Sequence, residues 1–101
     1  MFGKEYALKY TEQFDRELAA ASRYIAEKLE NQIAAEQLVN DVEVAILDRL
    51  AAPESFMPVM SSKFREHKYY RIDVGNFIVL YVVIGDVMEV RRFVYGHSDW
   101  K

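Results

Sequence analysis

Three β-rich runs near the C-terminus constrain the fold of this chain more than any other feature. They cover Tyr69–Val74, Phe77–Ile84 and Val87–Tyr95. The dipeptides Gly75-Asn76 and Gly85-Asp86 separate them, and such dipeptides are typical of two-residue hairpin turns. The runs therefore predict a three-stranded antiparallel meander in the last third of the chain.

The first half predicts a short strand followed by two helices. Apolar residues alternate over Tyr6–Tyr10, which indicates a strand, and Thr11 is a candidate N-cap. Two apolar stripes at helical spacing follow. They consist of Phe14, Leu18, Ala21, Ile25 and Leu29 in the first helix, and of Ala35, Leu38, Val42, Ala45, Ile46 and Leu50 in the second, which runs from about Ile33 to Ala51. The short break at Asn31-Gln32 makes the helices an antiparallel pair.

A loop is predicted over residues 53–68, where prolines and serines accumulate: Pro53, Pro58, Ser61 and Ser62. We expect the loop to contribute apolar residues to the core, namely Phe56, Met57, Val59 and Met60. The fold class is therefore α+β, with an N-terminal strand, an antiparallel helical hairpin and a three-stranded antiparallel meander in a single domain, residues 1–101. Two helices cover one face of such a sheet, so the other face is expected to be free for binding.

Composition argues against several classes of protein. The chain has no cysteine, so it has no disulfide or thiolate metal site, and its two histidines, His67 and His97, lack the spacing of a metal motif. No glycine-rich phosphate-binding loop is present. The longest apolar run, Phe77–Ile84, is shorter than the roughly 20 residues of a membrane-spanning helix, and the N-terminus lacks a secretory signal. We expect a cytoplasmic protein without metal, cofactor or membrane anchor.

Charge is distributed unevenly along the chain. The net charge is −3, but residues 1–62 contain six Lys or Arg and eleven Asp or Glu, whereas residues 63–101 contain seven and five. An anionic partner is therefore expected to meet the C-terminal part.

The candidate functional residues are basic and aromatic and lie in that part: Arg71, Tyr81, Arg91, Arg92, Tyr95, His97 and Trp100. Cleavage of RNA without a metal needs an acid–base group such as histidine and cations that stabilise the phosphorane. Each residue could also have a purely structural role. Arginines on strands keep an exposed sheet face hydrated, and tyrosines pack their rings in the core while the hydroxyl remains in water. Adjacent strand positions point to opposite faces, so either Arg91 or Arg92 should reach the helix-covered side or its rim.

Two runs resemble the RelE/ParE superfamily of type II toxins. Tyr69–Tyr81, YYRIDVGNFIVLY, is similar to a strand-pair motif of the family, and Val90–Trp100, VRRFVYGHSDW, is similar to its closing motif. The resemblance implies the same strand–helix–helix–meander order and a cognate antitoxin, acidic to neutral, encoded alongside. It also implies a target, which is mRNA on the ribosome for RelE-type members and DNA gyrase for ParE-type members.

Carried over residue by residue, the resemblance matches Arg71 and Arg92 to basic residues of the family, while Arg91 is an addition and His97-Ser98 replaces a common Arg-Arg pair. We expect His97, Arg71 and Arg92 to be catalytic, and Arg91, Tyr81, Tyr95 and Trp100 to bind substrate. Asp73, Ile78 and Ser98 stand where ribonucleases of the family have cations. The first hypothesis is a metal-independent, ribosome-dependent mRNA endoribonuclease. The alternatives are a gyrase-inhibiting toxin without nuclease activity, a catalytically weakened member, or an unrelated small binding domain. Antitoxin docking is expected at an apolar rim formed by Phe2, the outer edge of the first helix and Trp100.

Overall fold

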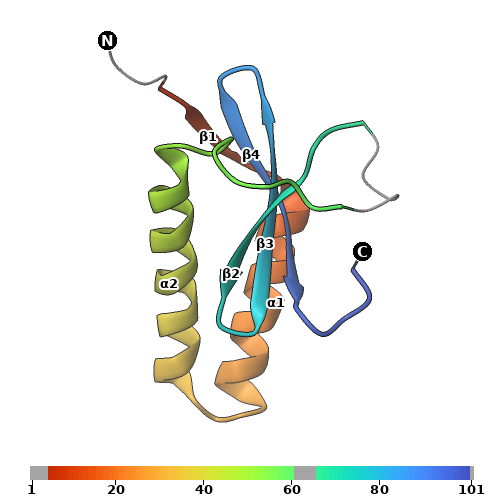
Figure 1. The fold of residues 1–101 in the computed structure, drawn as a ribbon. Coiled ribbons are helices and arrows are strands. Elements are labelled where there is room, and N and C mark those ends of the chain that lie inside the picture. Colours follow the sequence, from red (N-terminus) through yellow and green to blue (C-terminus); the bar gives the residue numbers. More distant parts are fainter. Residues whose placement is uncertain (1–4, 61–65, 101) are drawn as a thin grey trace.

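The computed structural model describes residues 5–60 and 66–100, and it has the predicted α+β order (Figure 1). The elements are β1 (Ala7–Tyr10), α1 (Glu12–Glu27), α2 (Gln32–Leu50), β2 (Tyr70–Val74), β3 (Phe77–Ile84) and β4 (Val87–Tyr95). No helix in these two ranges is long and apolar enough to cross a membrane.

The strands form one mixed sheet in the order β1-β4-β3-β2. The meander β2–β3–β4 is antiparallel, as predicted, and β1 pairs in parallel with β4. Gly75 and Gly85 adopt left-handed φ angles of 58° and 60° at the two hairpin turns, where a side chain would strain the backbone. The first strand of the chain thus lies beside the last one.

Both helices begin at side-chain caps. Thr11 Oγ1 accepts a hydrogen bond from the Phe14 N–H, which confirms the predicted cap of α1. Asn31 Oδ1 accepts one from the Ala34 N–H at the start of α2. The helices then run antiparallel and are joined at the end of the hairpin away from β1 (Figure 1).

The main core lies between the helical hairpin and one sheet face. Its buried members are Phe14, Val42, Ile46, Tyr70, Ile72, Val79, Tyr81, Met88, Val90 and Phe93, with Leu18, Ala21, Leu38, Ala45 and Leu50 packed against them. Most of both predicted stripes is therefore confirmed. The prediction for Leu29 was wrong: α1 ends at Glu27, and the Leu29 side chain is 58% exposed.

The opposite sheet face carries a second apolar cluster, which corrects the expectation that this face is free. Its buried members are Ile78, Leu80, Val94 and Trp100, and Val59 and Tyr69 pack against them; we call this set the open-face cluster. The face is covered because the chain beyond β4 brings Trp100 back onto it and the α2–β2 loop adds Val59.

The α2–β2 loop contributes less to the core than its apolar residues suggested. Met57 and Met60 are both 84% exposed and Phe56 is half-exposed, so the prediction that they fill the core was wrong. Of the four residues, only Val59 packs against a cluster, while Pro53 at the start of the loop is fully buried. Ser61 and Ser62, like Phe2 of the expected docking rim, lie outside the described residues.

Candidate functional site

A β-bulge in β4 sets the positions of the two adjacent arginines. Leu80 of β3 pairs with Arg92, whereas Tyr81 pairs with Val90, so Arg91 is an extra residue in the ladder. The Thr11 hydroxyl donates a hydrogen bond to the carbonyl oxygen of Arg91 at 3.0 Å, which ties the bulge to the start of α1.

Arg92 reaches α1, which confirms that one arginine of the pair lies at the rim of the helix-covered side. Its Nε and Nη2 donate to both carboxylate oxygens of Glu17 at 2.8–3.1 Å, and the Phe93 N–H donates to the same carboxylate at 2.8 Å. The hydrogen bond to Glu17 raises the pKa of the Arg92 guanidinium. Glu17 therefore neutralises Arg92 and also satisfies a backbone donor of β4.

Arg91 also forms an ion pair, on the sheet face that carries the open-face cluster. Its Nε donates to Glu89 at 2.6 Å and its Nη1 donates to the Tyr69 hydroxyl at 2.9 Å. The hydrogen bond from Arg91 lowers the pKa of the Glu89 carboxyl below its ordinary value of 4.5 in spite of burial, and Lys9 lies 3.6 Å from the same carboxylate.

Arg71, predicted to be catalytic, lies on β2 opposite Leu80 of β3. Its Nε and Nη2 donate to Asp73 Oδ1 at 3.1 and 2.6 Å, and its guanidinium carbon lies 5.4 Å from the centre of the Trp100 ring. Asp73 therefore neutralises the Arg71 guanidinium on the same strand.

Tyr95 and His97 lie together at the end of β4. The ring centres are 5.2 Å apart, and the Tyr95 ring also packs edge-on against Phe77 at 5.8 Å. Both side chains are exposed, so His97 is accessible to a ligand. Among the described residues it makes no ion pair with a carboxylate.

Tyr81, which was predicted to bind substrate, is not accessible to a ligand. It is fully buried, its hydroxyl donates to the Pro53 carbonyl oxygen at 2.6 Å, and it accepts from Arg49 Nη1 at 2.9 Å. Burial raises the pKa of the Tyr81 phenol, although Arg49 acts in the opposite direction. Tyr81 anchors the α2–β2 loop, and it offers no surface to a ligand.

Trp100 is also buried rather than presented to a substrate. Its indole packs in the open-face cluster, and its Nε1 donates to the Gly96 carbonyl oxygen at 3.4 Å. The same burial removes it from the expected docking rim. The predicted site residues are thus divided among the core, the open face and the end of β4.

The partners that neutralise the arginines were missed at the level of sequence. Asp73 and Glu89 each lie two residues from their arginine, a separation that places both side chains on one face of a strand. Glu17 is three residues after Phe14 in α1, so it lies beside the buried stripe and faces the sheet. These spacings are the features of the sequence that could have identified the three carboxylates as partners of the arginines.

As a chemical site, the assembled residues hold little free positive charge. Each of the three predicted cations, Arg71, Arg91 and Arg92, has a carboxylate within hydrogen-bonding distance. A phosphate that approached any of them would compete with that carboxylate for the positive charge. The arrangement stabilises the sheet and its contact with α1.

Fold and site together define a small α+β toxin-like domain whose arginines are internally paired. The family model for the ParE toxin of the type II toxin–antitoxin system parDE matches residues 8–100. The chain therefore belongs to the ParE toxin family, within the RelE/ParE superfamily, and is the toxin component of a type II toxin–antitoxin system.

Solved structures share this fold. A chain of the chromosomal ParDE toxin–antitoxin system from P. aeruginosa superposes with a TM-score of 0.75 at 15% identity, covering 90% of this chain and 96% of that one. A chain of the E. coli DinJ–YafQ toxin–antitoxin complex gives 0.59 at 10% identity, with coverages of 96% and 99%. YafQ from E. coli strain BL21(DE3) gives 0.57 at 12% identity, with coverages of 95% and 99%. No curated protein sequence matches the chain significantly.

Proposed function

We propose that this toxin acts by contact with a protein target, DNA gyrase, without cleaving RNA, and that a cognate antitoxin neutralises it. The observation that carries the proposal is the pairing of Arg71, Arg91 and Arg92 with Asp73, Glu89 and Glu17. A nuclease needs uncompensated cations where negative charge develops on phosphate. Here that charge is compensated within the fold.

The family match and the net charge support the same target. The matching family model describes ParE toxins, and the resemblance of the sequence implies gyrase as the target of such toxins. A net charge of −3 disfavours docking on ribosomal RNA, because phosphate contacts dominate such binding. A protein target has no comparable requirement for basic surface. The toxin–antitoxin complexes among the structural neighbours support an antitoxin as the second partner.

Ribosome-dependent mRNA cleavage is the second candidate, and His97 favours it. This side chain is exposed beside Tyr95 at the end of β4 and could exchange a proton with RNA. In this alternative the catalytic residues would be His97, Arg71 and Arg92, and the arginines would have to leave their carboxylates when RNA binds.

A paired assay separates the two functions. The purified toxin is added to a gyrase supercoiling reaction and to a translation reaction in which mRNA ends are mapped. We expect loss of supercoiling, intact mRNA, and the same inhibition by the His97→Ala variant. Cleaved mRNA that depends on His97, with normal supercoiling, would replace this proposal by the nuclease.

A further inference from the structure

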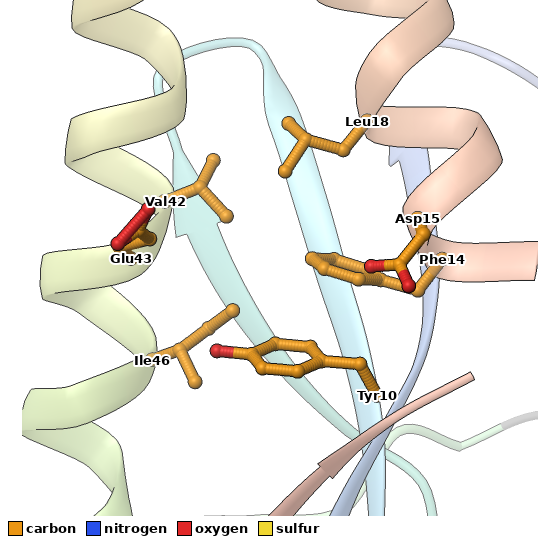
Figure 2. Close-up of a pocket in the computed structure, with 7 residues that line it drawn as sticks. All are labelled: Tyr10, Phe14, Asp15, Leu18, Val42, Glu43 and Ile46. Carbon is orange, nitrogen blue, oxygen red and sulfur yellow. The ribbon is translucent and has the colours of Figure 1, made fainter. Parts of the chain in front are cut away.

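A cleft of about 310 Å³ opens between α1 and α2, and none of the residues predicted to be functional lines it (Figure 2). Its lining consists of Tyr10, Phe14, Asp15, Leu18, Val42, Glu43 and Ile46. Both helices and the end of β1 therefore contribute side chains to one recess.

The base of the cleft is apolar. Phe14, Val42 and Ile46 are members of the main core, and the Tyr10 ring stacks on Phe14 with ring centres 5.4 Å apart. Figure 2 shows the two rings lying between the helices, with Ile46 facing them from α2. Above these buried residues, the exposed part of Tyr10 and the half-buried Leu18 favour an aliphatic or aromatic group over water.

The cleft also carries two carboxylates, Asp15 on α1 and Glu43 on α2, from opposite sides (Figure 2). Both residues are exposed, and neither forms an ion pair within residues 5–60 and 66–100. Burial raises the pKa of the Tyr10 phenol, and the charges of Glu43 and Asp15 raise it further. The negative field therefore extends into the cleft.

The surface of α2 beside the cleft has the same sign, whereas α1 carries Arg16 and Arg23 as well as acidic residues. The acidic residues of α2 are Glu36, Asp41, Glu43 and Asp48. Its one basic residue, Arg49, donates to the Tyr81 hydroxyl and to the Arg71 carbonyl oxygen, so its charge is directed toward the loop and sheet. Charge complementarity therefore favours a partner that brings positive charge to the α2 side of the cleft.

We propose that the cleft binds a lysine or arginine side chain from a basic amphipathic segment of the cognate antitoxin. The aliphatic stem lies on Tyr10 and Leu18, and the cation lies between Asp15 and Glu43, since long basic side chains bury their stems and keep the charge at the surface. The inference rests on the antitoxin of the proposed function. The family resemblance implied an acidic-to-neutral antitoxin. At this cleft we instead expect the contacting segment of the antitoxin to be basic, because its charge must complement the carboxylates of this chain.

The test measures binding of the antitoxin encoded beside this chain to the full-length toxin and to an Asp15→Asn/Glu43→Gln variant. We expect the variant to bind about five- to thirtyfold more weakly, because two exposed ion pairs are lost. Raising the ionic strength from about 0.05 M to about 0.5 M should weaken wild-type binding more than variant binding. A Glu27→Gln/Asp48→Asn variant changes the net charge equally on the same helices outside the cleft, and it should retain at least most of the affinity.

Three outcomes would overturn the inference: unchanged affinity of the Asp15/Glu43 variant, equal losses in both double variants, and no binding of the antitoxin to the wild-type chain. Self-association of the free chain that depends on Asp15 and Glu43 would assign the cleft to a second copy instead. Thermal unfolding of each variant excludes a loss of fold as the cause. Gyrase inhibition by the same free proteins is measured separately, so failure of the target and failure of the cleft are distinguishable.

Discussion

At the scale of single residues, the arginines of β4 show how a carboxylate decides the role of a cation. Arg92 belongs to the motif that carries the family resemblance, and in isolation it is a candidate for holding phosphate. In the folded chain it forms two-pronged hydrogen bonds with Glu17, which also accepts the Phe93 N–H. The same guanidinium therefore stabilises the contact between α1 and β4.

Glu17→Gln should lower the free energy of unfolding by about 1–2 kcal/mol, because hydrogen bonds to a charged group are lost at a partly exposed site. Urea denaturation measures the change, and Glu27→Gln, an exposed acid of the same helix, serves as the control. Gyrase inhibition by the folded variant should be unchanged. A variant as stable as wild type would show that the pair is only a surface contact, and a gain of RNA cleavage would indicate that Glu17 restrains a catalytic Arg92.

At the scale of elements, one threonine connects a helix start with a strand irregularity. Thr11 caps α1 through its side-chain oxygen, and the same hydroxyl donates to the Arg91 carbonyl oxygen at the bulge of β4. Its own N–H donates to the Val90 carbonyl oxygen. The cap could be predicted from the sequence because it depends on local neighbours, whereas the link to the bulge joins residues 80 positions apart.

Thr11→Ala should destabilise the fold by about 1–2 kcal/mol, because the Phe14 N–H and the Arg91 carbonyl both lose a partner. Thr11→Ser keeps the hydroxyl and should stay within about 0.5 kcal/mol of wild type. Chemical denaturation followed by far-ultraviolet circular dichroism measures both variants. Equal losses in the two variants would mean that the methyl group, and not the hydroxyl, is the stabilising part.

At the scale of the whole molecule, the sheet is covered on both faces. The helical hairpin covers one face, and Trp100 with Val59 and Tyr69 covers the centre of the other. The sequence predicted that this second face is free to bind a partner, but in the structure it is packed against Trp100, Val59 and Tyr69. Exposed features of the described residues include His97 with Tyr95 at the end of β4 and the acidic cleft between the helices.

Trp100→Ala should lower the free energy of unfolding by about 3 kcal/mol, because removing a large buried side chain leaves Ile78, Leu80 and Val94 uncovered. Denaturant unfolding measures the loss, and binding of a hydrophobic dye reports the exposed sheet face. Trp100→Phe keeps most of the apolar area and should recover much of the stability. Wild-type stability of the alanine variant, with lost activity, would instead support a direct binding role for Trp100.

The sequence by itself determined the strand and helix order, the cap of the first helix and the hairpin turns, because each depends on periodicity or on residues a few positions apart. It also indicated the family, since the two matching runs are contiguous. Only the tertiary structure decided that Glu17 neutralises Arg92, that Trp100 closes the second sheet face, and that two carboxylates lie on opposite sides of one cleft. These features join segments distant in the chain, such as Glu17 and Arg92 at a separation of 75 residues. Local patterns can place a residue on a face of its element, but they do not identify its distant partner, because such pairs form only when packing brings the elements together.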